Sequence, residues 1–205
     1  FWTKKLSVGF VWTMRNQKKV MGVTFLILLL SGWGMSKMEV NNFLLEDLTE
    51  EDPMNASFIF FDDNFSGVRP LEISIESKQD SILTDKVIRQ LDTIQQIALE
   101  IYPATSFVSV VEGIKFGNRA IKNGVNTHYQ VPEDKKSLKK ILSKAKKRHK
   151  KGEFKQYISD NGMKTRMSAN VPDLGGNAFT ALHQEFFERL EGRFDGLEIH
   201  QTGTA

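Results

Sequence analysis

An uncharged run of seventeen residues, Val20 to Ser36, constrains this chain more than any other feature. Its centre, Val23 to Leu30, is strongly apolar, and side chains of this kind each contribute roughly −0.3 to −0.6 kcal/mol toward membrane insertion. Seventeen residues make about 26 Å of helix, slightly less than a ~30 Å hydrocarbon core, and flanking lysines can extend to the headgroups. The sequence therefore predicts a transmembrane helix over 20–36.

Two other interpretations of this run compete with a membrane helix. A cleaved signal peptide has a similar apolar core, but Ser31-Gly32-Trp33-Gly34 is a poor substitute for a small-residue cleavage site. A buried core helix would also be apolar, yet a helix that is apolar all round and flanked by lysines is rare in so small a domain. The pattern favours the membrane helix.

The charges on either side of the apolar run predict its orientation. Basic residues precede it, whereas acidic residues follow it: Lys4, Lys5, Arg15, Lys18 and Lys19, against Glu39, Glu46 and Asp47. The positive-inside rule places residues 1–19 in the cytoplasm and the chain after about residue 37 outside it. We expect residues 1–19 to form a cytoplasmic or interfacial lead-in, because Phe1 to Met14 resembles an interfacial amphipathic helix.

Charge is segregated along the rest of the chain. Ten of the 28 basic residues lie between Lys135 and Lys151, where there is no acidic residue, and the other 18 are outnumbered by 25 acidic residues. Eight acidic residues and no basic one lie between Glu39 and Asp63. The net charge of +3 thus describes an acidic protein with one basic helix.

Residues 37–67 read as an acidic connector followed by a short helix. Asp52-Pro53 is typical of a helix start, and Gly67 is a stop signal. The following stretch, Arg69 to Glu76, alternates apolar and polar residues as a half-buried strand does.

Residues 68–205 predict an α+β domain. A helix capped by Thr84 carries apolar residues at 4-3-4-3 spacing until Pro103, and two further alternating or apolar stretches (163–171 and 197–201) flank a helix that follows Gly175-Gly176-Asn177. Residues 105–110 fit a second strand, while Ser109 to Glu112 fits a capping box that opens a helix. The order is β-α-β, a helical insert at about 109–160, then β-α-β, the split βαβ (ferredoxin-like) pattern.

Several short motifs resemble those of one transporter family. These are the apolar helix, the acidic connector Leu44 to Leu48, Asp52-Pro53, Phe60-Phe61-Asp62, and the run Phe65-Ser66-Gly67-Val68-Arg69-Pro70-Leu71-Glu72-Ile73. Together they resemble the RND superfamily of exporters, in its MMPL/Patched-like branch. The resemblance covers nearly the whole chain from Val20 to Ala205.

The resemblance implies a membrane helix that leads into an extracytoplasmic porter domain in the bacterial inner membrane, with proton-driven export of a lipid or other hydrophobic substance. The partners implied are membrane lipid, the remainder of a longer transporter chain and the substrate, with room for a homo-oligomer. The family's proton-relay acids lie in other membrane helices, and residues 20–36 contain none. The alternative is a single-pass, membrane-anchored ligand-binding or sensor domain.

Two sets of residues are candidates for contact with ligands. Substrate passing between porter subdomains would meet phenylalanines, although core packing is the stronger expectation for them: Phe58, Phe61, Phe65, Phe186 and Phe187. The basic helix could contact anionic lipid headgroups or an anionic substrate through Lys139, Lys140, Lys146 and Lys147. A solvated helix face is the simpler interpretation, and the absence of interleaved aromatic residues argues against nucleic acid.

No pattern in the sequence predicts an enzyme, a cofactor or a metal site. The chain has no cysteine, no G-x-S-x-G motif and no phosphate-binding glycine loop. Its four histidines lack metal-ligand spacing, and we expect them on the surface: His128, His149, His183 and His200.

Overall fold

The computed structural model describes residues 10–38, 43, 51–65 and 67–202, and divides the chain into two units, 1–40 and 41–205. The first unit contains helix α2, Gln17–Met35, preceded by helical residues 10–15. No side chain of α2 is buried, and the helix of nineteen residues is long and apolar enough to cross a membrane. The predicted span was 20–36. Helix α2 begins earlier, at Gln17, so it also includes Lys18 and Lys19, and it ends at Met35.

The second unit begins, within the described residues, with helix α3, Pro53–Asn64. The Asp52 carboxylate accepts a hydrogen bond from the Met54 amide at 2.8 Å, which confirms the predicted helix start. The prediction of an acidic connector falls mainly on residues 39–42 and 44–50, which lie outside the described residues.

A three-stranded antiparallel sheet forms the centre of this unit, in the order β2-β1-β3. The strands are β1 (Arg69–Ser77), β2 (Lys164–Val171) and β3 (Leu197–Thr202), with Ile73 opposite Met167 and Ile75 opposite Ile199. Alternate residues of β1 and β2 are buried, as their sequence patterns predict.

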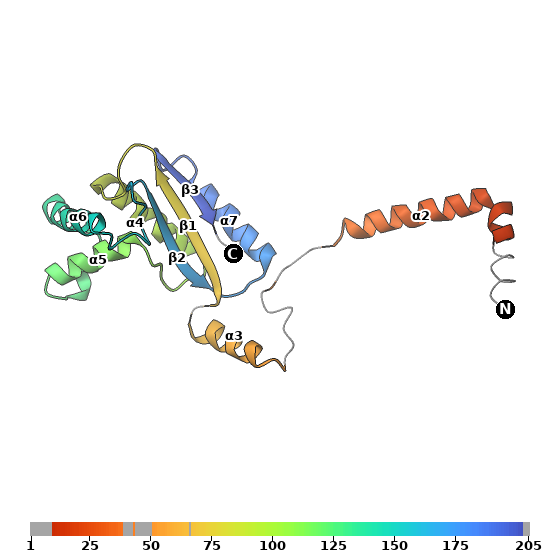
Figure 1. Ribbon diagram of the computed structural model, residues 1–205, viewed down its shortest axis with the longest axis horizontal. Helices are drawn as coiled ribbons and strands as arrows, with labels where there is room; N and C mark the ends of the chain where they lie inside the picture. Colours follow the sequence, from red (N-terminus) through yellow and green to blue (C-terminus); the bar gives the residue numbers. More distant parts are fainter. Residues whose placement is uncertain (1–9, 39–42, 44–50, 66, 203–205) are drawn as a thin grey trace. The chain divides into compact units, whose positions relative to one another are not determined.

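Helices α4 (Asp85–Ile101) and α7 (Gly176–Leu190) cover one face of the sheet (Figure 1). They contribute to a single core together with β1 and β2, and its largest fully buried side chains include Phe179, Phe186, Leu71, Ile73 and Leu91. The opposite face of β1 is polar and carries cross-strand ion pairs such as Glu76 with Lys164 at 2.8 Å. The fold is α+β, as the sequence predicts.

A helical insert joins α4 to β2. It consists of α5 (Val110–Ile121), the short 3₁₀ helix η1 (Asn126–His128) and α6 (Lys135–Lys150). Figure 1 shows α5 and α6 beyond the β2 edge of the sheet, and α5 contacts both β2 and α6.

Of the two interpretations that the sequence leaves open here, the capping box at Ser109 to Glu112 is confirmed and the strand over residues 105–110 is wrong. Only Val108 pairs with β2, through two backbone hydrogen bonds with Ser168 of 2.7 and 3.1 Å. The next residue, Ser109, is the N-cap of α5 and accepts a hydrogen bond from the Glu112 amide, so the chain turns away from the sheet. The three strands keep the order that they have in a split βαβ sheet. The remaining strand of that pattern, which would lie beside β2, is reduced to the single bridge at Val108.

The helical insert predicted over about 109–160 is not helical to its end, although the apolar spacing of Phe154, Tyr157 and Ile158 would continue a helix. Helix α6 ends at Lys150, and Gly152 has a φ of +83°, a conformation that ends a right-handed helix. Residues 151–157 form turns instead, and Ile158 is buried and pairs with Thr165 of β2.

Candidate functional site

A groove lies between the two long helices of the insert, α5 and α6. The faces that these helices bury against the protein are apolar except for Asn118 of α5: they contain Val110, Val111 and Ile114 from α5, and Leu138, Ile141, Leu142 and Ala145 from α6. Gly117 allows the two helices to approach closely, because a Cβ added there would lie 3.3 Å from Cγ2 of Ile141.

The groove has a volume of about 660 Å³, within the range of small-molecule sites. Its rim includes large apolar side chains that stay open to solvent, namely Val108 (53% exposed), Phe116 (57%) and Ile121 (39%). Phe154 and Tyr157, from the turns after α6, also line it. This groove, defined by α5, α6 and residues 106–109 and 154–157, is called the insert groove below.

Two cationic residues of α6 also line the insert groove. Arg148 forms a salt bridge with Glu153 at 2.5 Å, and its guanidinium lies 5.4 Å from the centre of the Phe154 ring. Lys144 is exposed and forms no ion pair within the part of the chain that the structure describes. An apolar groove bordered by cations suits a ligand that has an apolar body and an anionic end.

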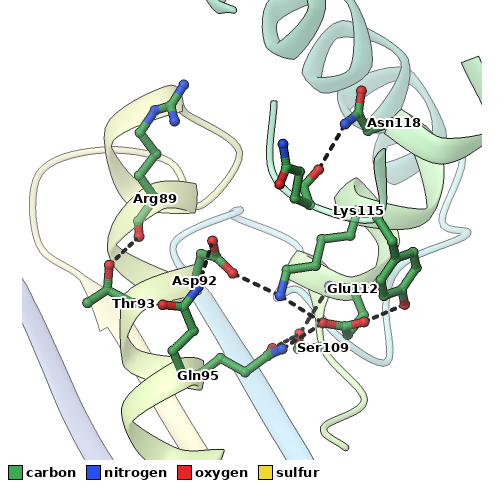
Figure 2. A network of polar contacts seen from close by, with 11 residues as sticks. Arg89, Asp92, Thr93, Gln95, Ser109, Glu112, Lys115 and Asn118 are labelled. Atoms are coloured by element: carbon green, nitrogen blue, oxygen red, sulfur yellow. Dashed lines mark hydrogen bonds and ion pairs between the residues drawn. The ribbon is translucent and has the colours of Figure 1, made fainter. Parts of the chain in front are cut away.

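A polar network joins α5 to α4 at one side of the insert groove (Figure 2). The Lys115 ammonium lies 2.9 Å from the Asp92 carboxylate of α4 and 3.2 Å from the Glu112 carboxylate on its own helix. Gln95 of α4 donates a hydrogen bond to Glu112 at 2.7 Å, and the Ser109 hydroxyl donates to Gln95 at 2.5 Å. The helices are therefore joined by charged and neutral contacts together.

The network extends to the segment around η1. The Tyr129 hydroxyl donates a hydrogen bond to Glu112. The Asn118 side-chain amide donates to the backbone carbonyls of His128 and Gln130, at 2.9 and 3.0 Å. These bonds hold the η1 segment against α5 beside the insert groove.

The pKa values of the two central charges are shifted away from catalytic use. Burial raises the pKa of Glu112, but the hydrogen bonds from Tyr129 and Gln95 and the charge of Lys115 outweigh it, so the pKa lies below its usual value. Burial lowers the pKa of Lys115, but its contacts with Asp92 and Glu112 outweigh that effect and raise the pKa. A general base or a nucleophilic lysine needs the opposite shifts, so this network supports structure and charge placement.

The structure does not bring the five candidate phenylalanines together. Phe58 is half-buried on α3, whereas Phe61 and Phe65 are 50% and 57% exposed and pack against each other at 5.2 Å. Phe186 is buried in the domain core, and its neighbour Phe187, which is 37% exposed, borders a separate hollow beside β3. None of the five lines the insert groove.

Three of the four candidate lysines line one cavity, on a different side of α6 from the insert groove. Lys139, Lys146 and Lys147 lie around it, whereas Lys140 is exposed elsewhere on the helix. Helical spacing separates Lys140 from Lys139 and Lys146, but the sequence does not show which of these faces borders a cavity, because that depends on the position of α4.

Of the four histidines, all predicted to lie on the surface, only His200 is exposed, whereas His128, His149 and His183 are half-buried. The prediction is most clearly wrong for His183. Its Nδ1 lies 2.7 Å from the hydroxyl of Tyr102, and its Nε2 lies 2.5 Å from the side-chain nitrogen of Gln201. The helical spacing in the sequence indicated that His183 faces the core, since it follows Phe179 by four residues and precedes Phe186 by three, and both phenylalanines are buried. Among the described residues, no group of three or more His, Asp or Glu side chains is placed to hold a metal ion.

Sequence reasoning missed most residues of the insert groove. Phe116, Ile121 and Val108 became visible as a group only when α5, α6 and the bridge to β2 were placed together. Comparisons with known proteins found neither a protein-family model nor a curated protein that matches this chain.

Proposed function

We propose that this chain is part of a proton-driven exporter of the RND superfamily, in its MMPL/Patched-like branch. It contributes one membrane helix and an extracytoplasmic porter domain. In this proposal α2 spans the bacterial inner membrane, the residues after about 37 are periplasmic, and the remainder of the transporter chain supplies the proton relay. The substrate class is a lipid or another hydrophobic substance.

The insert groove is the observation that carries the proposal. A site of about 660 Å³ with exposed Phe116, Val108 and Ile121 on its rim can accept an acyl chain or a similar apolar body. Burying apolar ligand surface there, rather than leaving it in water, is favourable by roughly 25 cal/mol per Å², so the groove can shield an acyl chain outside the membrane. Lys144 can hold an anionic end of the same ligand.

A tryptophan reporter tests ligand occupancy of the insert groove. All three native tryptophans lie within the first 33 residues, so a variant with Trp2, Trp12 and Trp33 replaced by phenylalanine provides a tryptophan-free background. In that background, Phe116→Trp places the only tryptophan on the groove rim, its fluorescence is excited selectively over that of the three tyrosines, and a brominated fatty acid is the quenching probe. We expect saturable quenching for Phe116→Trp and only weak, linear quenching for the control Phe187→Trp on α7.

Equal quenching of the two reporters would overturn the assignment of the insert groove as the ligand site. A second variant, Ala120→Phe, fills the groove from α5, where Ala120 is an exposed lining residue. It should weaken the saturable quenching about tenfold, because it removes volume that the acyl chain would occupy.

A single-pass, membrane-anchored ligand-binding or sensor domain is the second function to consider. The network of Lys115 with Asp92 and Glu112 favours it, because it connects the groove to the main core through α4. Intact mass analysis of the native protein isolated from its membrane separates the two functions. An exporter requires a much longer polypeptide with several further apolar spans and acids within them, whereas an anchored sensor requires a single span.

A further inference from the structure

A second cavity lies between α6 and the start of α4, and it is lined mainly by lysines. Its volume is about 610 Å³, and its polar lining includes the side chains of Lys135, Lys139, Lys146, Lys147 and Lys150. Leu83 and Leu142 supply an apolar floor. This cavity is called the lysine cavity below.

Helical spacing gathers these lysines on one side of α6. Lys135, Lys139, Ser143, Lys146 and Lys150 follow each other at intervals of three and four residues, so four of the five lysines lie along one face together with a serine. None of the five lysines forms an ion pair in the part of the chain that the structure describes. The repulsion between like charges at this spacing is therefore not offset by the protein.

The carboxylate that lines the lysine cavity is already engaged. Asp85 accepts a hydrogen bond from Nε of Arg89 at 2.7 Å, and the same arginine donates to the backbone carbonyls of Pro132 and Glu133. Arg89 thus holds the Asp85 charge, and the lysines are left without a carboxylate partner there.

Thr84 provides an uncharged donor to the lysine cavity. It is the N-cap residue of α4, but its hydroxyl makes no capping hydrogen bond, and this buried oxygen has no hydrogen-bond partner among the described residues. An anion bound beside Thr84 would lie at the positive end of the α4 dipole, and rotation of the Thr84 side chain would allow its hydroxyl to donate a hydrogen bond to that anion. The lysine cavity is therefore lined by five lysines, a threonine whose hydroxyl has no hydrogen-bond partner among the described residues, and the N-terminus of α4.

We propose that the lysine cavity is a binding site for a phosphate-bearing anion. Lysine ammonium groups are compact point charges that bind phosphate oxygens without a fixed geometry, and a phosphate supplies several acceptors for them. A free phosphate compound and an anionic phospholipid headgroup present the same chemistry. The site does not depend on the insert groove or on export, because its lining is separate from that of the groove apart from the shared helix α6.

Titration of the full chain with inorganic pyrophosphate, in neutral nanodiscs at 50 mM salt, tests the proposal by calorimetry. We expect saturable binding that weakens at least tenfold in the triple variant Lys139→Gln/Lys146→Gln/Lys147→Gln. The matched control is Lys136→Gln/Lys140→Gln/Lys151→Gln, which removes the same charge from exposed positions of the same helix segment outside the lysine cavity. The control should change the affinity less than threefold.

Two further variants test the hydroxyl. Thr84→Val keeps the shape of the side chain but removes the donor, and it should weaken pyrophosphate binding severalfold, whereas Thr84→Ser should retain it. Equal weakening by the two lysine triple variants would overturn the proposal, since it would mean attraction by net charge alone. No saturable binding by the unmodified chain at millimolar pyrophosphate would also overturn it.

The source of the phosphate is distinguished by the lipid in the nanodisc. The titration is repeated in nanodiscs in which one fifth of the phosphatidylcholine is replaced by phosphatidylglycerol. A lipid headgroup in the lysine cavity would compete with pyrophosphate, so the apparent affinity of the unmodified chain for pyrophosphate would fall. The residual pyrophosphate binding of the variant Lys139→Gln/Lys146→Gln/Lys147→Gln would not change. Unchanged affinity would support a soluble phosphate compound as the ligand.

Discussion

Arg69 and Asp173 form a buried ion pair across 104 residues of sequence, with 2.7 Å between Nη1 and Oδ1. Their side chains are only 8% and 6% exposed. The guanidinium also lies 4.8 Å from the centre of the Phe179 ring, and the Asp173 carboxylate accepts a hydrogen bond from the Gly175 amide. The pair therefore connects the start of β1 to the loop that leads from β2 into α7.

Removing one partner of this pair should destabilise the domain strongly. Arg69→Met leaves the Asp173 charge buried without its cation, a change that costs about 3–5 kcal/mol. The double variant Arg69→Met/Asp173→Leu should recover most of that loss, because it removes both charges. Urea unfolding in neutral detergent, followed by circular dichroism, measures the free energies of unfolding.

The exposed pair of Lys78 with Glu198, at 2.6 Å, is the control for the buried pair. Its side chains are 59% and 44% exposed, so solvent screens the interaction and Lys78→Met should cost no more than about 1 kcal/mol. Losses of similar size from Arg69→Met and Lys78→Met would contradict the importance assigned to burial.

Gly67 should tolerate no side chain. Its φ is +105°, and an added Cβ would lie 2.0 Å from the carbonyl carbon of Val171. Gly67→Ala therefore combines backbone strain with a backbone clash, and we expect a loss of about 3 kcal/mol or more in the free energy of unfolding.

Gly113 is the matched control for this substitution. It lies within α5, and a Cβ added there meets nothing within 4 Å. Gly113→Ala should stabilise the domain by about 0.5–1 kcal/mol, because alanine loses less conformational entropy in a helix. Similar midpoints of urea unfolding for the two variants would refute the close approach of Gly67 to Val171.

The elements with strong local signals could be predicted from the sequence. The alternation of Leu71, Ile73 and Ile75 predicted the buried face of β1, and Asp52-Pro53 predicted the start of α3. In both cases the residues that specify the element are neighbours in the chain, so no knowledge of the tertiary structure was needed.

The errors arose where two local signals competed or where one residue ended a pattern. Residues 105–110 have the composition of a strand, but the side chain of Ser109 caps α5 and limits pairing to Val108. The apolar spacing through Phe154 and Ile158 is helical, yet Gly152 adopts a left-handed conformation that interrupts the helix. Periodicity alone carries no information about either backbone change.

The two candidate ligand sites could be predicted only in part. The run of lysines in α6 was evident, and helical spacing could have grouped Lys139, Lys146 and Lys150 apart from Lys140. The insert groove was not predictable, because its walls come from α5, α6 and the segment that bridges to β2 at Val108. Its exposed apolar rim is a property of how these elements pack.

The charge of Glu112 should stabilise the domain in a pH-dependent way. The pKa of Glu112 is lower in the folded chain than the ordinary value of about 4.3, so its contribution is present above that pH and is lost as pH falls through the folded pKa. The pKa of Lys115 is raised, so its contribution is present below about 10.4 and is lost as pH rises through its folded pKa. Both contributions are therefore present at pH 7.

Glu112→Gln should reduce the free energy of unfolding by roughly 1–2 kcal/mol at pH 7, because charged hydrogen bonds are lost. The difference from the unmodified chain should shrink as the pH is lowered from 5 to 3. Urea unfolding at pH 7, 5 and 3 measures it, with Glu191→Gln as an exposed control that should stay within about 0.5 kcal/mol. A difference that stays constant down to pH 3 would argue against the charged network.

The orientation of the chain in the membrane can be tested with single cysteines, because the native sequence contains none. Asn16→Cys reports on the segment before α2, and Ala181→Cys reports on an exposed position of α7. The positive-inside rule predicts that Ala181→Cys reacts with a membrane-impermeant maleimide in spheroplasts, whereas Asn16→Cys reacts only after the membrane is opened. Labelling of both cysteines after detergent treatment is the control for reactivity. The reverse pattern would place the α+β domain in the cytoplasm and rule out the proposed function as a periplasmic porter domain. The tests of the insert groove and the lysine cavity would still apply.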